Sequence, residues 1–149
     1  MSLTRDDPKF ERPIEDVAQL VDFFRAGEKP RPEWRVGTEH EKIGMYAQSR
    51  RPVPFEGERG IQTLLATIAR EHGWKPLLDA GVLVGLESDG ATITLEPGGQ
   101  LELSGVPLAS MHDTLREFRA HIALVNRVSE PLGMVWLGLG VQPIVPVQD

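Results

Sequence analysis

The fold is decided by residues 95–105, which read Leu95-Glu96-Pro97-Gly98-Gly99-Gln100-Leu101-Glu102-Leu103-Ser104-Gly105. A straight strand would hold Glu96 and Glu102 about 20 Å apart, at ~3.3 Å per residue. If Pro97-Gly98-Gly99 instead forms a three-residue hairpin loop, Glu96 faces Gln100 and Thr94 faces Glu102. The leucines then share one face of the hairpin and the polar side chains share the other, with the two carboxylates ~7–8 Å apart on a diagonal. A two-residue turn at the glycines would mix the two faces, so we predict the three-residue loop.

A second acidic stretch lies in a predicted strand from Trp34 to Tyr46, at Thr38-Glu39-His40-Glu41-Lys42. Side chains alternate across a strand, so Glu39 and Glu41 share one face while His40 and Lys42 take the other. Two like charges ~7 Å apart repel by roughly 2 kcal/mol at an effective dielectric constant near 20, which exceeds the ~1 kcal/mol range of strand propensities. Four strand carboxylates therefore require an explanation.

Two explanations fit these carboxylates. Hard cations such as Mg²⁺ or Mn²⁺ prefer oxygen ligands and commonly also hold substrate phosphates. Alternatively, the glutamates line a solvated face and pair with basic side chains, for which Arg35, Lys42 and Arg59 are candidates. Residue chemistry alone leaves both open.

Composition limits the class of protein. The chain has 149 residues, a formal charge of −6 and no cysteine, so it reads as one domain (1–149) without disulfides or thiol chemistry. The negative charge argues against nucleic-acid partners and anionic membranes, because both bind clustered Lys and Arg. The first residues lack the apolar core of a signal peptide, and prolines interrupt the last apolar run. We expect a cytoplasmic protein without a membrane span.

The remaining elements follow from periodicity and from turn residues. Helices are predicted over Ile14–Ala26, from Ile61 to Gly73, and from near Ser110. In the last helix the side chains expected to face inward are Met111, Leu115, Phe118, Ile122 and Val125. Strands are predicted at Val82–Leu86, Ala91–Leu95, Gln100–Ser104 and Met134–Leu139, the first two joined by Ser88-Asp89-Gly90. This order predicts an α+β fold, an antiparallel sheet with helices packed on one face.

Several of these motifs together resemble a known enzyme family. They are Gly37-Thr38-Glu39-His40-Glu41-Lys42-Ile43-Gly44, the stretch 95–105, His112, and Leu137-Gly138-Leu139-Gly140 before Gln142-Pro143. In this order they resemble glutamate-cysteine ligase of the plant and proteobacterial type. The resemblance covers residues 32–143, and residues 1–31 read as an N-terminal helix and linker.

The resemblance implies ATP-dependent ligation of the L-glutamate γ-carboxylate to the L-cysteine amine through a γ-glutamyl phosphate, the first step of glutathione biosynthesis. It also implies a glutamine-synthetase-like antiparallel sheet with acidic metal ligands. Carried onto this chain, the ligands of Mg²⁺ or Mn²⁺ are Glu39, Glu41, Glu96 and Glu102. Gln100 either orients substrate or is a solvated strand residue, and no catalytic side chain is predicted beyond the metal ligands.

Other candidate residues have simpler expected roles. His40 should be a hydrogen-bonded structural histidine, and His72, His112 and His121 should cap helices or lie at the surface. Arg50 and Arg51 could approach an anionic substrate but more simply form a solvated loop pair.

Members of the resembled family are far longer than this chain. The chain therefore reads as an N-terminal portion that cannot complete the reaction unaided, and that self-associates or pairs with a C-terminal portion. Two other functions stay open: a ligase that joins glutamate to a different amine, and a non-catalytic metal-binding or interaction module.

Overall fold

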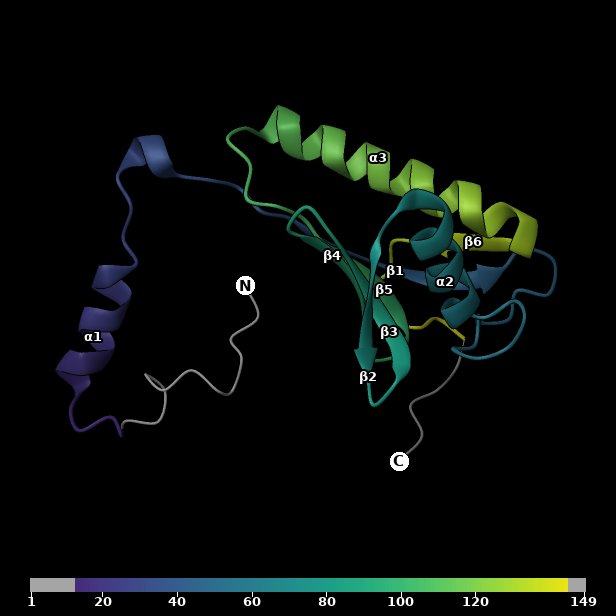
Figure 1. The fold of residues 1–149 in the computed structure, drawn as a ribbon, viewed down its shortest axis with the longest axis horizontal. Helices are drawn as coiled ribbons and strands as arrows, with labels where there is room; N and C mark the ends of the chain where they lie inside the picture. Colours follow the sequence, from purple (N-terminus) through teal and green to yellow (C-terminus); the bar gives the residue numbers. More distant parts are fainter. Residues whose placement is uncertain (1–12, 145–149) are drawn as a thin grey trace. The chain divides into compact units, whose positions relative to one another are not determined.

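The computed structural model describes residues 13–144 and contains two compact units (Figure 1). We call them the N-terminal unit, Met1–Trp34, and the sheet unit, Arg35–Asp149. The N-terminal unit contains α1 (Val17–Ala26) and a 3₁₀ turn at Arg31–Glu33. α1 begins where the Asp16 side chain accepts a hydrogen bond from the backbone N–H of Gln19, at 2.9 Å, and no α1 residue is buried.

The sheet unit is built on a six-stranded antiparallel sheet in the order β2-β3-β4-β5-β1-β6. Its strands are β1 (Glu39–Tyr46), β2 (Lys75–Asp79), β3 (Val82–Ser88), β4 (Ala91–Glu96), β5 (Gln100–Ser104) and β6 (Met134–Leu137). Two helices, α2 (Ile61–His72) and α3 (Met111–Ser129), cover one face of this sheet (Figure 1). We call the helix-covered face the core face and the opposite face the open face. The predicted α+β class with an antiparallel sheet is confirmed.

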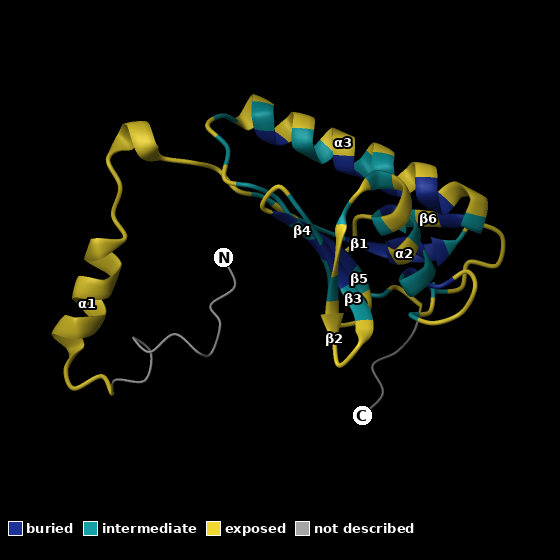
Figure 2. Cartoon of the chain, in the orientation of Figure 1, coloured by how far each residue is buried: buried dark blue, intermediate teal, exposed yellow. Residues whose placement is uncertain are grey.

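The hydrophobic core lies between the core face and the two helices. Its buried side chains come from α2, α3 and the central strands (Figure 2), and they are Ile61, Leu64, Leu65, Ile68, Leu86, Ala91, Ile93, Leu101, Leu103, Val125 and Val128. Burying a Leu or Ile side chain contributes about 1.5–3 kcal/mol, so this cluster dominates the stability of the sheet unit. Among residues 13–144, none of the helices has both the length and the apolar character to span a bilayer.

The two predicted tight turns are confirmed. Glu96 lies opposite Gln100 and Thr94 lies opposite Glu102, as the three-residue loop requires. Within that loop Gly98 and Gly99 have φ of 82° and 77°, and the Gly99 N–H donates to the Glu96 carbonyl at 3.1 Å. These are left-handed conformations that glycine adopts without steric cost. The other turn, at Asp89-Gly90, joins β3 and β4 with positive φ at both residues.

Some predicted boundaries were wrong. The first strand begins at Glu39 rather than Trp34, α1 begins at Val17 rather than Ile14, and β6 ends at Leu137 rather than Leu139. Strand β2 was not predicted at all. It is one of the two edge strands and contains Pro76, and all but one of its residues are exposed, so it lacks the buried apolar alternation that identifies inner strands.

The prediction of which α3 side chains face inward was also wrong in part. Met111 is 64% exposed and Leu115 is 42% exposed. The buried side chains of α3 are instead Thr114, His121, Val125, Val128 and Ser129. The helix is therefore rotated toward a stripe that includes polar residues. A hydrophobicity pattern cannot identify such a stripe, because it scores Thr, His and Ser as surface residues.

Candidate functional site

All four predicted carboxylates project from the open face of the sheet. In the β1–β5 register Glu39 lies opposite Ser104 and Glu41 lies opposite Glu102, while Gln100 lies opposite Glu96 in the β4–β5 register. His40 lies on the core face, where its ring packs edge-on against Phe118 of α3 with 4.5 Å between ring centroids. The alternation predicted for β1 is therefore confirmed. The β4–β5 hairpin and strand β1, which is distant from it in sequence, bring the carboxylates to one area.

Glu102 is at the centre of this acidic group. It is buried, with 7% of its surface exposed, and the Ser104 hydroxyl donates a hydrogen bond to its Oε1 at 2.5 Å. A hydrogen bond with Glu102 raises the pKa of Glu96, and the negative charges of Glu102, Glu41 and Glu39 raise it further. The four carboxyl groups are thus close enough for each to affect the protonation of Glu96. An added cation would relieve this repulsion.

These carboxylates do not by themselves form a complete metal cage. Among the described residues, no three His, Asp or Glu side chains converge on one point where an ion could be held. The donors are nevertheless of the right kind, since the acidic group offers carboxylate oxygens and Mg²⁺ is commonly held by one or two carboxylates together with waters and substrate phosphates. The residues therefore fit a hard cation that is completed by other ligands.

The acidic group opens onto a cleft. A cavity of about 480 Å³ is lined by Glu41 and Glu96 of the acidic group, by His40 and Gln100, and by the segment Gly138–Gly140 that follows β6; Glu39 and Glu102 are not among its lining residues. The Gln100 amide is held only loosely, because its Nε2 lies 3.5 Å from the Pro97 carbonyl. The sequence motif contained Gly138 and Gly140 but gave them no role. The structure makes them the wall that faces the carboxylates.

Neither glycine in this wall is required by the local backbone. At both positions φ lies outside the left-handed region, and a Cβ added at either would meet nothing within 4 Å. The Leu139 N–H donates to the Leu137 carbonyl at 3.0 Å, which turns the chain sharply after β6.

Lys42 lies beneath the acidic group, on the core face. It is 1% exposed, and its ammonium donates to the carbonyls of His40 and Leu101, both at 3.0 Å. Burial lowers the pKa of Lys42 to about 8, although Glu41 and Glu102 act in the opposite direction. In the described part of the chain, Lys42 makes no ion pair with a carboxylate. The proposed pairing of Lys42 with the glutamates on a solvated face is therefore wrong, because alternation buries its side chain.

Two histidine expectations are also corrected. His121 is not at the surface: it is 5% exposed, and neither ring nitrogen has a hydrogen-bond partner among the described residues. Burial, together with the nearby charges of Lys42 and His40, lowers the pKa of His121 to about 3. His40 is structural through ring packing rather than through its Nδ1, which likewise lacks a partner in residues 13–144. Burial also lowers the pKa of His40.

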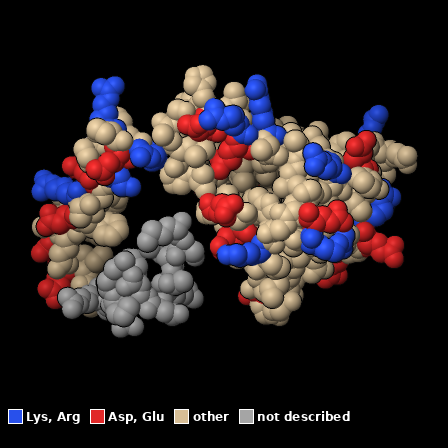
Figure 3. All heavy atoms as spheres, turned by 45° about the horizontal axis from the view of Figure 1, so that its top comes forward, with Lys and Arg blue, Asp and Glu red and all other residues tan. Residues whose placement is uncertain are grey.

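Charged side chains elsewhere are mixed in sign. Figure 3 shows Lys and Arg side chains interspersed with Asp and Glu side chains over the visible surface of the sheet unit. One further glutamate, Glu87 of β3, lies on the open face opposite Thr92 and Lys75. It is separated from β1 by two intervening strands, or about 14 Å, so it does not belong to the acidic group.

Comparison with known proteins identifies relatives of this chain. The profile of a family described as glutamate-cysteine ligase family 2 matches residues 35–149. The chain is 41% identical over 124 residues to "Glutamate--cysteine ligase, chloroplastic" of Medicago truncatula, covering 83% of this chain and 24% of that protein. It is 39% identical over 130 residues to "Glutamate--cysteine ligase A, chloroplastic" of Oryza sativa subsp. japonica, covering 87% and 26%. The chain thus spans about a quarter of the length of these relatives.

Proposed function

Because the chain belongs to glutamate-cysteine ligase family 2, we propose that it forms one acidic, metal-binding wall of an ATP-dependent ligase site. The observation that supports this proposal is that Glu39, Glu41, Glu96 and Glu102 lie on the same face of three neighbouring strands, close enough for the other three to raise the pKa of Glu96. We further propose that the sheet corresponds to part of a glutamine-synthetase-like fold. The cytoplasmic location stays a prediction.

The proposed reaction has two steps. The γ-carboxylate of L-glutamate attacks the γ-phosphorus of ATP, giving γ-glutamyl phosphate and ADP. The amine of L-cysteine then attacks the acyl phosphate carbonyl; the amine loses a proton, inorganic phosphate leaves, and γ-glutamylcysteine forms. Phosphoryl transfer of this kind depends on positioning and on neutralising the charge that develops on the phosphate oxygens.

The residues of this chain have distinct parts in that scheme. Glu41, Glu96 and Glu102, together with Glu39, would hold Mg²⁺ or Mn²⁺, and the bound cation would neutralise phosphate charge. Gln100 lines the same cleft and is free to orient a bound substrate. The glycine wall at 138–140 leaves room for a substrate to approach the backbone closely.

Metal binding tests the proposal directly. Titrating the chain with Mn²⁺, followed by electron paramagnetic resonance of the free ion, should reveal saturable binding. Glu102→Gln should weaken that binding at least tenfold, because it removes the carboxylate that lies opposite Glu41 and contacts Glu96. The matched control is Glu87→Gln, since Glu87 lies on the same face but outside the acidic group. Equal effects of the two substitutions, or no saturable binding, would contradict the proposed wall.

Two other functions compete with this one. A ligase with another amine acceptor would use the same acidic wall, and replacing cysteine by other amines in a turnover assay distinguishes it. A non-catalytic metal-binding or interaction module would bind Mn²⁺ and self-associate, but it would give no turnover even when the remaining family segment is supplied.

A further inference from the structure

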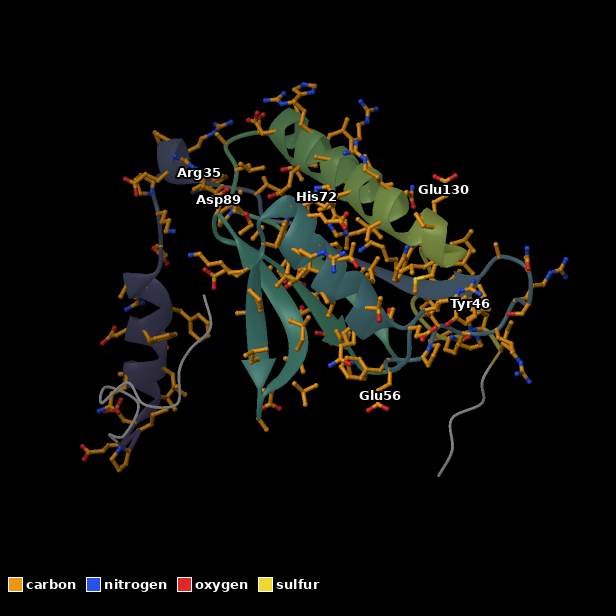
Figure 4. All side chains as sticks on the ribbon, turned by 45° about the vertical axis from the view of Figure 1, so that its right-hand side comes forward. Arg35, Tyr46, Glu56, His72, Asp89 and Glu130 are labelled. Carbon is orange, nitrogen blue, oxygen red and sulfur yellow. The ribbon has the colours of Figure 1, made fainter. Side chains whose placement is uncertain are left out.

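A second polar pocket lies at the far end of β1 from the acidic group. It has a volume of about 550 Å³, and five strand positions, or about 17 Å, separate Tyr46 at this end from Glu41. Its walls come from the turn after β1, from the loop before α2 and from the turn between α3 and β6. Figure 4 shows Tyr46 and Glu130 at this end of the sheet unit.

Arg59 is fixed in this pocket by several contacts. Its Nε donates to the Leu132 carbonyl at 2.7 Å, and its guanidinium lies 4.9 Å from the centre of the Tyr46 ring. The Tyr46 hydroxyl donates to the Arg59 carbonyl at 2.7 Å. Gly133 has φ of 70°, and a Cβ there would collide with Nη2 of Arg59. Both the backbone and the side chain of Arg59 are therefore held in place.

The two Nη groups of Arg59, which together can bind two oxygen atoms of one ligand, have no acceptor among residues 13–144. Nε is occupied by Leu132, whereas no hydrogen bond or ion pair engages the Nη groups within residues 13–144. Glu130 lines the same pocket but does not pair with Arg59 there. Two neutral donors are close by: the Gln48 amide, and the Ser49 hydroxyl, which accepts from the Arg51 N–H at 3.3 Å and keeps its own proton to donate.

We propose that this pocket binds a small oxyanion, a carboxylate or phosphate group, through the Nη edge of Arg59. A planar guanidinium held in one orientation matches two oxygens of such a group and loses little further freedom on binding. Gln48 and Ser49 would donate to the remaining oxygen atoms. The simpler alternative is that Arg59 only ties the loop before α2 to the turn after α3.

Nuclear magnetic resonance of the arginine side chains distinguishes these roles. The ¹⁵N-labelled 149-residue chain would be titrated in separate arms with inorganic phosphate and with acetate, at constant ionic strength. We expect saturable shifts of the Arg59 Nε–Hε signal and of the Gln48 and Ser49 amides. The arm that saturates at lower concentration identifies phosphate or carboxylate as the preferred group.

Three variants complete the test. Arg59→Gln should weaken binding at least tenfold, and Ser49→Ala, which leaves the Arg59 contacts intact, should weaken it about threefold. The control Arg70→Gln removes an exposed arginine that pairs with Glu71 and should change nothing. The proposal is overturned if no signal saturates, if Arg70 responds as Arg59 does, or if Arg59→Gln binds like the parent. If Arg59→Gln fails to fold, unchanged binding by Ser49→Ala together with equal shifts at Arg59 and Arg70 overturns it.

Discussion

At the scale of single residues, the core face carries an unusual group of buried nitrogen atoms. Lys42, His40 and His121 lie together beneath the acidic group, and the two histidines have ring nitrogens without partners among the described residues. A buried polar atom without a partner costs roughly 1–3 kcal/mol. The large apolar core offsets this cost. Acid sensitivity has a separate cause, because burial lowers the pKa values of both histidines in the folded chain.

His121 should account for a measurable part of this acid sensitivity. Its folded-state pKa of about 3 lies below the ordinary value of 6.5, so the unfolded chain binds a proton first as the pH falls. With respect to His121, the free energy of unfolding is therefore highest above pH 6.5 and falls as the pH drops below that value. His121→Leu should reduce the loss of unfolding free energy between pH 6.5 and pH 5 by about 2 kcal/mol, because one pKa unit corresponds to ~1.4 kcal/mol.

Urea denaturation at pH 7 and at pH 5 measures this difference. His112→Leu is the matched control, because His112 is exposed on the same helix and should leave the pH dependence unchanged. His40 and Lys42 of β1 face His121 and are present in both variants, so their own titration cancels in the comparison. Parallel pH profiles for the parent and His121→Leu would show that His121 is not responsible.

At the scale of elements, the loop of the β4–β5 hairpin sets the geometry of the acidic group. Gly99 holds a left-handed conformation, so Gly99→Ala should destabilise the chain by about 1–2 kcal/mol. The same change should weaken Mn²⁺ binding, because it alters the offset between Glu96 and Glu102. Gly138→Ala is the control for stability: its Cβ meets nothing and its φ is not left-handed. Thermal denaturation of the two variants gives the comparison, and equal stability losses would contradict this account of the turn.

The elements also show which features a sequence can predict. The hairpin register was predictable, because alternating leucines and carboxylates allow only one loop length that separates the faces. That Glu39 and Glu41 share one face of the sheet was predictable for the same reason, because side chains alternate between the two faces along a strand. Strand β2 and the stripe of α3 were not predictable, since an edge strand with Pro76 and a buried His121 both depend on tertiary neighbours. The position of Gly138–Gly140 beside the carboxylates could not be predicted from the sequence, because no local pattern indicates which strands lie next to this segment.

At the scale of the whole molecule, the described residues provide one side of the proposed site rather than a closed one. The acidic group faces an open cleft, and no three of the described acidic or histidine side chains converge to hold an ion. The matched part of the chain covers 24% of one relative and 26% of the other. A ligase also needs groups that bind the nucleotide and the two amino acids, and the described cleft contains no lysine or arginine.

The 149-residue chain should therefore bind Mn²⁺ without catalysing ligation. Incubated with Mg-ATP, glutamate and cysteine, it should release no more phosphate than a protein-free blank, while a full-length glutamate-cysteine ligase serves as the positive control. Adding the remaining family segment as a separate polypeptide should restore phosphate release that depends on both amino acids and that Glu102→Gln reduces at least tenfold. Robust turnover by the chain alone would contradict this, because it would require phosphate-binding side chains, and the lining of the described cleft contains no lysine or arginine. Self-association without turnover in the reconstituted mixture would instead favour a non-catalytic module, since the same acidic wall would then bind metal without a substrate beside it.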